Sequence, residues 1–353
     1  MDLQTAVAVS MLPAARVRVA EAFKELRHAS GTGWAFLELI WGVAGRGEPL
    51  GPGGLASIVT AADVALCRAK DLGIVPIASF DPRYPQLLAC TADPPPVLWT
   101  RGNVQVFARP GVAVIGSRAA TPYALQVGRR IAAELAERGI LVVSGLARGV
   151  DSAAHRGCLT AGPTAAVLGS GLDRVYPPEH ADLAAEIAAS GVLITELAPG
   201  SAPLPGHFPL RNRIISGISL ATVVVEASEQ SGSLITARCA LEQGRDVMAV
   251  PGSVLSGRNR GSHALLKDGA RFVETADDIL QELGWSPAVK PSSIAKGASS
   301  DPILRQMERG TAYELDQLAA LTGLNGARLL ARLTELELAG AVAVAGGRFV
   351  RQG

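Results

Sequence analysis

The chain has 353 residues, of which 48% are hydrophobic and 18% are charged, and its formal net charge is +1. This length and composition predict two or three domains with a sizeable core and a chain that is mostly folded. A nearly neutral protein lacks the broad basic face that coats duplex DNA, so any site for a polyanion has to be local.

Four cysteines lie far apart and include no C-x-x-C pair: Cys67, Cys90, Cys158 and Cys239. This spacing argues against a zinc ribbon and a disulfide framework and favours small buried thiols in a reducing compartment. The first residues, Met1-Asp2-Leu3, lack the basic and apolar regions of a secretory signal, and no uncharged apolar run reaches about 18 residues. We therefore expect a cytoplasmic protein without a membrane span.

Residues 1–70 are predicted to be helical, because Ala15–Leu26 and Trp34–Val43 repeat apolar residues with helical spacing. They form either a small packed module or an interaction appendage. Residues 74–110 are rich in proline, which excludes a long helix there. We expect this extended segment to wrap onto the domain that follows.

From residue 111 onward, short apolar runs alternate with helical patterns. The expected strands are continuous β-branched runs, which is typical of strands buried on both faces: Val112–Ile115, Leu141–Val143, Ala165–Leu168, Leu193–Thr195, Thr222–Val225 and Val247–Val250. The helices between them begin with Thr121-Pro122, with Asp151, and near residues 181, 209 and 233. Repeated units of this kind predict an α/β domain over residues 71–285 with a doubly wound parallel sheet.

Residues 286–301 are rich in Ser, Pro, Ala and Lys and are predicted to be a linker. In residues 302–353, three helical patterns and a short hairpin predict a winged helix, with a plain helical cap as the alternative. Six acids and six arginines balance over residues 301–353. A helix that reads a DNA groove needs net positive charge, so we favour a partner or dimer contact there.

Four turns marked by glycine or arginine follow the predicted strands: Gly116-Ser117-Arg118, Ser144–Gly149, Phe208–Arg213 and Ser231-Gly232-Ser233. Ligands of parallel sheets bind at the carboxyl ends of the strands, where all four turns fall. Backbone N–H groups and guanidinium groups gathered there suit phosphates.

Catalysis is poorly supported by the same residues. The turn at Gly116 is not G-x-G-x-x-G, the strand before Ser144-Gly145 supplies no acid for a ribose, and no phosphate-binding P-loop is present. The sequence also lacks a G-x-S-x-G elbow, an H-E-x-x-H motif and clustered metal ligands. We therefore predict a binding protein with no catalytic residue, metal or cofactor.

Several side chains leave two interpretations open. Arg148 either binds a phosphate or pairs with an acid, and Ser231-Gly232-Ser233 forms either an anion nest or an ordinary helix cap. Phe208 with Arg211, Asn212 and Arg213 either stacks on a base beside phosphates or supplies a core ring and surface arginines. His155 is expected to be a packed residue, and Glu226 is expected to pair with an arginine rather than hold a ligand.

Taken together, these motifs resemble the DNA-processing protein A family, also called DprA or Smf. The resemblance covers about residues 75–275 and rests on motifs in the family's order: Tyr84-Pro85, Pro95–Leu98, Gly116-Ser117-Arg118, Ser144–Asp151 with Ala154-His155, Tyr176-Pro177, Phe208-Pro209 with Arg211–Ile215, Ser231–Ala237 and Pro251-Gly252. Members often begin with a sterile-alpha-motif-like or helix-hairpin-helix module. Residues 1–70 are helical, but Met11–Ala15 lacks the glycine-centred hairpin, so we assign no DNA contact there.

The resemblance implies an extended Rossmann-like domain that binds single-stranded DNA as a homodimer. Such proteins protect incoming strands during natural transformation and load the RecA recombinase, and they are not established enzymes. By motif match, the phosphate-pocket residues are Gly116, Ser117, Arg118, Phe208, Arg211, Asn212 and Arg213, with Arg148 a weaker match. The alternatives are an enzyme that acts on a nucleotide or phosphoribosyl compound at the same sheet edge, and a scaffold whose turns are structural.

Overall fold

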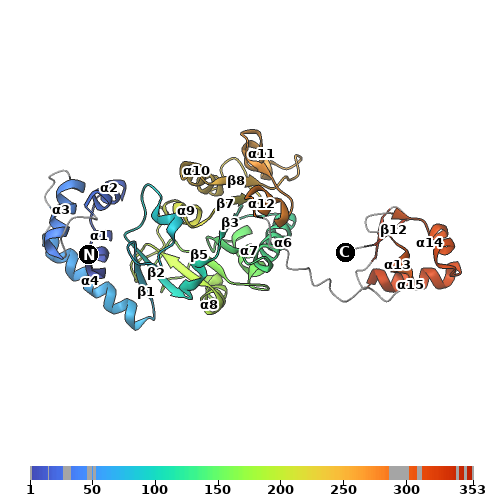
Figure 1. The fold of residues 1–353 in the computed structure, drawn as a ribbon, viewed down its shortest axis with the longest axis horizontal. Coiled ribbons are helices and arrows are strands. Elements are labelled where there is room, and N and C mark those ends of the chain that lie inside the picture. Colours follow the sequence, from blue (N-terminus) through green and yellow to red (C-terminus); the bar gives the residue numbers. More distant parts are fainter. Residues whose placement is uncertain are drawn as a thin grey trace. The chain divides into compact units, whose positions relative to one another are not determined.

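The computed structural model describes residues 2–14, 16–26, 33–45, 50, 53–285, 302–307, 312–338, 342–345 and 348–351. The chain divides into two compact units, Met1–Ser286 and Pro287–Gly353 (Figure 1). The predicted linker, residues 286–301, lies outside the described residues.

A nine-stranded sheet forms the centre of the first unit, in the order β1-β2-β6-β5-β4-β3-β7-β8-β9. Its strands are β1 Val75–Ala78, β2 Val97–Gly102, β3 Gly111–Ile115, β4 Leu141–Ser144, β5 Thr164–Val167, β6 Val192–Thr195, β7 Ala221–Val224, β8 Asp246–Ala249 and β9 Arg271–Phe272. Strands β3 to β9 are all parallel, whereas β1 and β2 pair antiparallel at one edge. The predicted doubly wound α/β fold is confirmed, and residues 74–110 join it as strands rather than only wrapping around it.

Helices cover both faces of this sheet, as the apolar strands predicted. They are α5 Gln86–Ala89, α6 Pro122–Glu137, α7 Val150–Cys158, α8 Ala181–Ser190, α9 His207–Ile218, α10 Ser233–Glu242, α11 Arg260–Lys267 and α12 Ala276–Glu282. Val112 and Val114 of β3 pack with residues of α6, α7 and α12, while the alternate residues Ala113 and Ile115 pack with residues of α9 and α10. Both β3 faces are therefore buried, which explains the unbroken apolar run.

The strand order creates a switch point beside β3. From β3 the chain adds β4, β5 and β6 in one direction, and it then returns to place β7 on the other side of β3. The connections that leave β3 and β7 therefore diverge, and a crevice opens at their carboxyl ends. This topology decides where a ligand site can lie.

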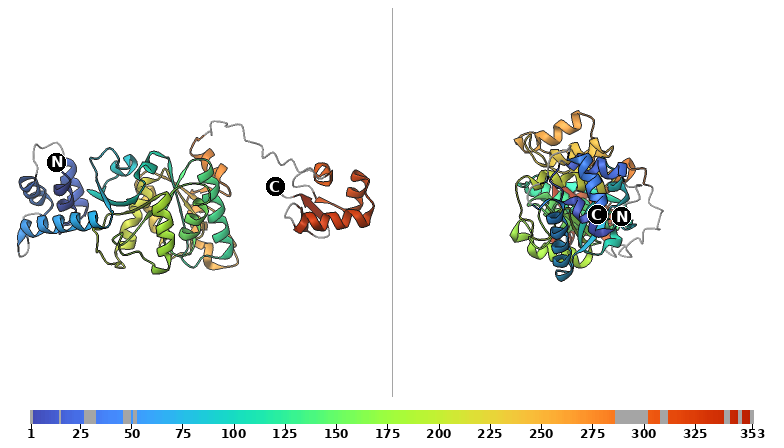
Figure 2. Two further views of the ribbon diagram at one scale, coloured as in Figure 1. Left: turned by 90° about the horizontal axis from the view of Figure 1, so that it is seen from below. Right: turned by 90° about the vertical axis from the view of Figure 1, so that its left-hand side faces the viewer.

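Within the described residues, four helices precede the sheet: α1 Leu3–Ser10, α2 Arg16–Leu26, α3 Trp34–Ala44 and α4 Gly54–Asp71. They lie at the end of the sheet that carries β1 and β2 (Figure 2). Phe36 and Ile40 of α3 belong to the same buried cluster as Trp99 of β2 and Leu193 of β6. These helices therefore share a core with the sheet instead of enclosing one of their own.

The second unit contains the three helices α13 Pro302–Gln306, α14 Leu315–Thr322 and α15 Gly326–Leu338. A small antiparallel sheet accompanies them, in the order β10 Ala312–Tyr313, β12 Arg348–Arg351 and β11 Val342–Ala345. Leu318, Leu333 and Phe349 are buried in a core that belongs to this unit alone. The predicted three helices and hairpin are confirmed, and strand β10 is an addition that the sequence did not indicate.

Candidate functional site

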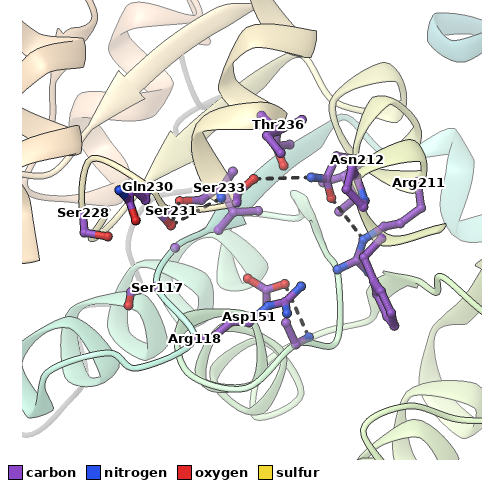
Figure 3. Close-up of a pocket in the computed structure, with 18 of the residues that line it drawn as sticks. Ser117, Arg118, Asp151, Arg211, Asn212, Ser228, Gln230, Ser231, Ser233 and Thr236 are labelled. Carbon is purple, nitrogen blue, oxygen red and sulfur yellow. Dashed lines mark hydrogen bonds between the residues drawn. The ribbon is translucent and has the colours of Figure 1, made fainter. Parts of the chain in front are cut away.

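A pocket of about 390 Å³ opens at the switch point, at the carboxyl ends of β3 and β7 (Figure 3). Four separate stretches of chain contribute to it: the turn after β3, the loop before α7, the first half of α9, and the loop between β7 and α10. Nine of the eleven predicted site residues line it, namely Gly116, Ser117, Arg118, Phe208, Arg211, Asn212, Ser231, Gly232 and Ser233. The fold thus brings the four marked turns to one place.

The turn after β3 is held by Glu226, which follows β7. The Ser117 N–H donates to the Glu226 carbonyl at 2.7 Å, and the Glu226 carboxylate accepts from Thr121 N at 3.2 Å and Thr121 Oγ1 at 2.6 Å. Thr121 in turn caps α6, as predicted. The prediction that Glu226 pairs with an arginine is wrong, because a backbone turn beside it supplies closer donors.

Arg118 is exposed at the mouth of the pocket. Its Cζ atom lies 5.7 Å from the centroid of the Phe208 ring, a cation–π distance. No carboxylate within the described part of the chain forms an ion pair with it. This guanidinium is therefore available to an anionic ligand.

Asp151 lines the pocket from α7 and is itself buried. It lies in the first turn of α7, after Gly149 at the N-cap position, so the prediction that it caps this helix is wrong by two positions. Its carboxylate accepts from Gly145 N at 3.1 Å and Ala147 N at 3.4 Å, and burial raises its pKa. Two amide groups expected to face a phosphate are thus already bound within the protein.

Arg211 lies beneath the pocket, buried among backbone oxygens. Its Nη1 donates to the carbonyls of Gly145 and Val167, and its Nε donates to Asn212 Oδ1 at 3.1 Å. Burial lowers the pKa of Arg211 to about 10, so the group stays charged at neutral pH. Its charge opposes that of Asp151 and contributes to the field in the pocket, while its donors are used for structure.

The start of helix α10 forms another wall of the pocket. Its N-cap, Gly232, has no side chain to accept from the first amides, and Ser231 Oγ lies 2.7 Å from Ser233 Oγ. Asn212 Nδ2 donates to the Gly232 carbonyl at 3.4 Å and ties α9 to this helix start. In Figure 3 a dashed line marks this hydrogen bond beside Ser233. The Ser233 amide donates to Ser231 Oγ at 3.4 Å, and the Leu234 and Ile235 amides donate to the carbonyls of Ser231 and Gly232. This helix start therefore favours an anion through its dipole and the nearby hydroxyls.

The structure does not bring Arg148 or Arg213 into this pocket. Arg148 Nε lies 2.5 Å from Glu179 Oε1 at the surface, beside a small adjoining cavity. Arg213 is buried and bonds to Glu196 Oε2 at 2.6 Å and to Asp93 Oδ2 at 3.2 Å. One arginine of the α9 motif therefore anchors the helix to residues outside the site.

Three further residues of this region were not predicted as site residues: Gln230, Thr236 and Tyr176. Thr236 and Tyr176 do lie in motifs on which the family resemblance rests. Thr236 follows Gly232 by four positions, so the first turn of a helix starting there would have indicated it. His155 is buried, its Nδ1 lies 2.8 Å from Thr164 Oγ1, and burial lowers its pKa to about 3. It is a packed residue, as predicted.

None of the described helices is long and apolar enough to cross a membrane. Within the same residues, no three His, Cys, Asp or Glu side chains are grouped so as to hold a metal ion.

Several known proteins are similar to this chain in sequence and in fold. Residues 76–284 match the family model of DNA recombination-mediator protein A, and residues 287–348 match the DprA winged helix domain. Protein Smf of Escherichia coli is 40% identical over 279 residues, which cover 76% of this chain and 75% of that protein. DNA processing protein DprA of Streptococcus pneumoniae is 42% identical over 204 residues, covering 58% of this chain and 72% of that protein.

Solved structures agree with the sequence matches. The X-ray structure of DprA from Streptococcus pneumoniae matches with a TM-score of 0.72 and 32% identity, covering 80% of this chain and 98% of that one. DNA processing protein A from Helicobacter pylori, whose structure concerns a single-stranded DNA binding mode, matches with a TM-score of 0.55 and 29% identity over 60% of this chain and 95% of that one. The chain belongs to the DNA recombination-mediator protein A family, known as DprA or Smf, and carries that family's winged helix domain.

Proposed function

We propose that this protein binds single-stranded DNA at the switch-point pocket. The observation that carries the proposal is Arg118: an exposed guanidinium without a carboxylate partner in the described residues, at the mouth of a pocket that is also lined by the start of α10 with the Ser231 and Ser233 hydroxyls. The relative from Helicobacter pylori, described by its single-stranded DNA binding mode, supports the same ligand.

The chemistry of the walls suggests how a strand would be held. A backbone phosphate lies between Arg118 and the N-terminus of α10, where Ser117, Ser231 and Ser233 offer hydroxyl donors. A pocket of about 390 Å³ accommodates a group the size of one nucleotide, and a flexible single strand can lower one nucleotide into it. A duplex keeps its phosphates on the outside of a stiff rod, so it cannot enter in this way.

The wider role belongs to the same proposal. Membership of the family supports a protein that works as a homodimer in the cytoplasm, protects incoming single strands during natural transformation, and loads the RecA recombinase onto them. Binding rather than catalysis fits the pocket residues, because Asp151 and Arg211 are occupied by internal hydrogen bonds. A dimer would also raise the apparent affinity for a long strand.

Substitution of Arg118 tests the pocket directly. Arg118→Ala removes one charge-assisted contact, worth about 1.5–3 kcal/mol, so the affinity for an oligothymidylate should fall roughly tenfold to a hundredfold. The slope of log affinity against log salt should become shallower by about 0.7 per phosphate lost. The control is Arg129→Ala, an exposed arginine of α6 outside the pocket. Wild-type affinity of Arg118→Ala at both salt concentrations would refute the assignment.

Ligand-induced stabilisation separates binding from the enzymatic alternative. A single-stranded oligonucleotide should raise the midpoint of thermal unfolding more than a mononucleotide at equal phosphate concentration, because it fills the pocket and adds neighbouring contacts. A nucleotide-processing enzyme would respond most strongly to the mononucleotide. A purely structural set of turns would respond to neither.

A further inference from the structure

A second cluster of aromatic and cationic side chains adjoins the pocket. A small cavity is lined by Arg148, Tyr176 and Pro177 together with Arg118, Phe208 and Arg211, which also line the main pocket. The cluster therefore shares a wall with the main pocket and extends away from it, toward Tyr176 and Arg148. The start of α10 does not line it, and of the turn after β3 only Arg118 does.

Two adjacent rings lie between two cations along this extension. The Arg118 guanidinium lies 5.7 Å from the Phe208 centroid, and the Tyr176 ring lies 5.3 Å from Phe208, tilted by 50°. Arg148 comes next, since it lines the same small cavity as Tyr176. Its hydrogen bond to Glu179 raises its pKa. The order Arg118, Phe208, Tyr176, Arg148 leads outward from the pocket.

Of the two rings, only Tyr176 has a large free surface. Phe208 is half-buried: Arg118 stands over it, Tyr176 packs beside it, and a Cβ on Gly169 would lie 2.9 Å from its Cδ1 atom. Tyr176 is 39% exposed. A base that follows a strand out of the pocket therefore meets the tyrosine, with Phe208 supporting that ring from behind.

The carboxylate of Glu179 pairs with Arg148 at the position where a phosphate would bind. The side chains of Arg148 and Glu179 are 54% and 49% exposed, so water and salt screen their attraction. A phosphate offers more acceptor oxygens to the guanidinium fork and displaces such a partner readily. Glu179 is thus placed to compete with a ligand rather than to stabilise the fold.

We propose that Tyr176 and Arg148 form a second nucleotide subsite, in which Tyr176 stacks on a base, Arg148 binds the adjoining phosphate, and Glu179 holds Arg148 until the strand displaces it. This inference rests on the proposed function, because it extends the same strand beyond the main pocket. It assigns the stacking in this subsite to Tyr176, whereas the sequence-based interpretation placed a base on Phe208.

Removal of the Glu179 carboxylate should increase the affinity for single-stranded DNA if this carboxylate competes with the strand for Arg148. Glu179→Gln should tighten binding of a long oligothymidylate by about threefold to tenfold, because Arg148 is then free before the strand arrives. In an Arg148→Ala background, Glu179→Gln should have no effect on affinity, since the two side chains act through one contact. Glu186→Gln, an exposed glutamate of α8 away from both cavities, controls for net charge. An unchanged affinity of Glu179→Gln, or an equal gain from Glu186→Gln, would overturn the proposal.

Replacement of the ring tests the stacking. Tyr176→Leu should weaken binding of an oligothymidylate severalfold and leave binding of an abasic strand of equal length unchanged, whereas Tyr176→Phe should bind both as the wild type does. A merely structural ring would affect both strands equally, and that result contradicts the subsite. If Arg118→Ala also leaves single-strand binding intact, the proposed function itself fails. If only the Tyr176 and Glu179 variants behave as the wild type, the main pocket stands without the second subsite.

Discussion

The four arginines around this site have three different environments. Arg118 is exposed and has no carboxylate partner among the described residues, Arg148 forms a surface ion pair, and Arg211 and Arg213 are buried against carbonyl and carboxylate oxygens. The difference lies in partners that stand far away in the sequence, such as Glu196 and Gly145. The sequence therefore predicts where guanidinium groups gather but not which of them remains available to a ligand.

Gly145 shows how closely Arg211 is fitted. A Cβ at this position would overlap the Arg211 guanidinium, which is buried and donates to the carbonyls of Gly145 and Val167. We expect Gly145→Ala to lower the free energy of unfolding by about 1–3 kcal/mol and to weaken single-strand binding through the displaced wall of the pocket. Chemical denaturation and oligonucleotide titration check both effects.

Gly206→Ala is the matched control, because open space surrounds Gly206 and its backbone is already αR. Its cost should be a few tenths of a kcal/mol at most. A Gly145→Ala protein as stable as this control would contradict the close fit inferred for Arg211.

His155 makes stability depend on pH. Its folded pKa is about 3, against about 6.5 in an unfolded chain, so the unfolded state binds more protons between these values. Stability should therefore fall as the pH drops from 7 to 5, by up to about 1.4 kcal/mol per pH unit once the pH is below 6.5. Denaturant titrations of the wild type and His155→Asn measure the difference. A wild-type curve as flat as that of the variant would refute the burial of a neutral imidazole.

Helices and strands differ in how much of them could be predicted. The central strands were recognisable because they are continuous apolar runs buried on both faces, and the start of α6 was recognisable because Thr121-Pro122 carries its own capping chemistry. Strands β9 and β10 span two residues each, which is too short for any periodicity. The start of α7 was misplaced because a buried Asp151 that binds loop amides resembles a helix cap in sequence.

Helix α10 allows a prediction in which stability and binding change in opposite directions. Gly232 is exposed and surrounded by open space at the start of this helix. Gly232→Asp places a carboxylate where the helix dipole favours it, by about 0.3–1 kcal/mol, so the fold should be as stable or more stable. The same charge occupies the proposed phosphate position and should reduce single-strand binding strongly.

Gly232→Asn separates charge from size in this experiment. It adds a side chain of nearly the same shape without the negative charge, so its affinity should lie much closer to that of the wild type. Equal losses from the two variants would mean that the side chain blocks the pocket, and the electrostatic role of the start of α10 would then be wrong.

At the scale of the whole molecule, the topology places the site. The reversal of strand order at β3 brings together a turn near residue 117, a helix near residue 211 and a loop near residue 231. The sequence predicted a shared edge because carboxyl ends of parallel strands coincide. It did not predict the order of the strands, since pairing between segments tens of residues apart is decided by the packing of all the helices.

We expect the first unit to bind single-stranded DNA without help from the second unit. The second unit has its own core, and residues 301–353 carry six acidic residues and six arginines, so they add no net positive charge to attract a phosphate backbone. A chain that ends at Ser286 keeps the switch-point pocket and Arg118. We expect it to unfold cooperatively and to bind a short oligothymidylate within about threefold of the full chain, with the same salt slope.

Fluorescence anisotropy of the truncated and full chains at two salt concentrations measures both quantities. The slope is the decisive one, because each phosphate neutralised on a single strand contributes about 0.7 to it. A full-length slope steeper by that amount or more would place a cationic contact in the winged helix domain and contradict a role limited to partner binding. Equal slopes with unequal affinities would instead indicate that the domain acts through dimer formation, which a titration at varied protein concentration then tests.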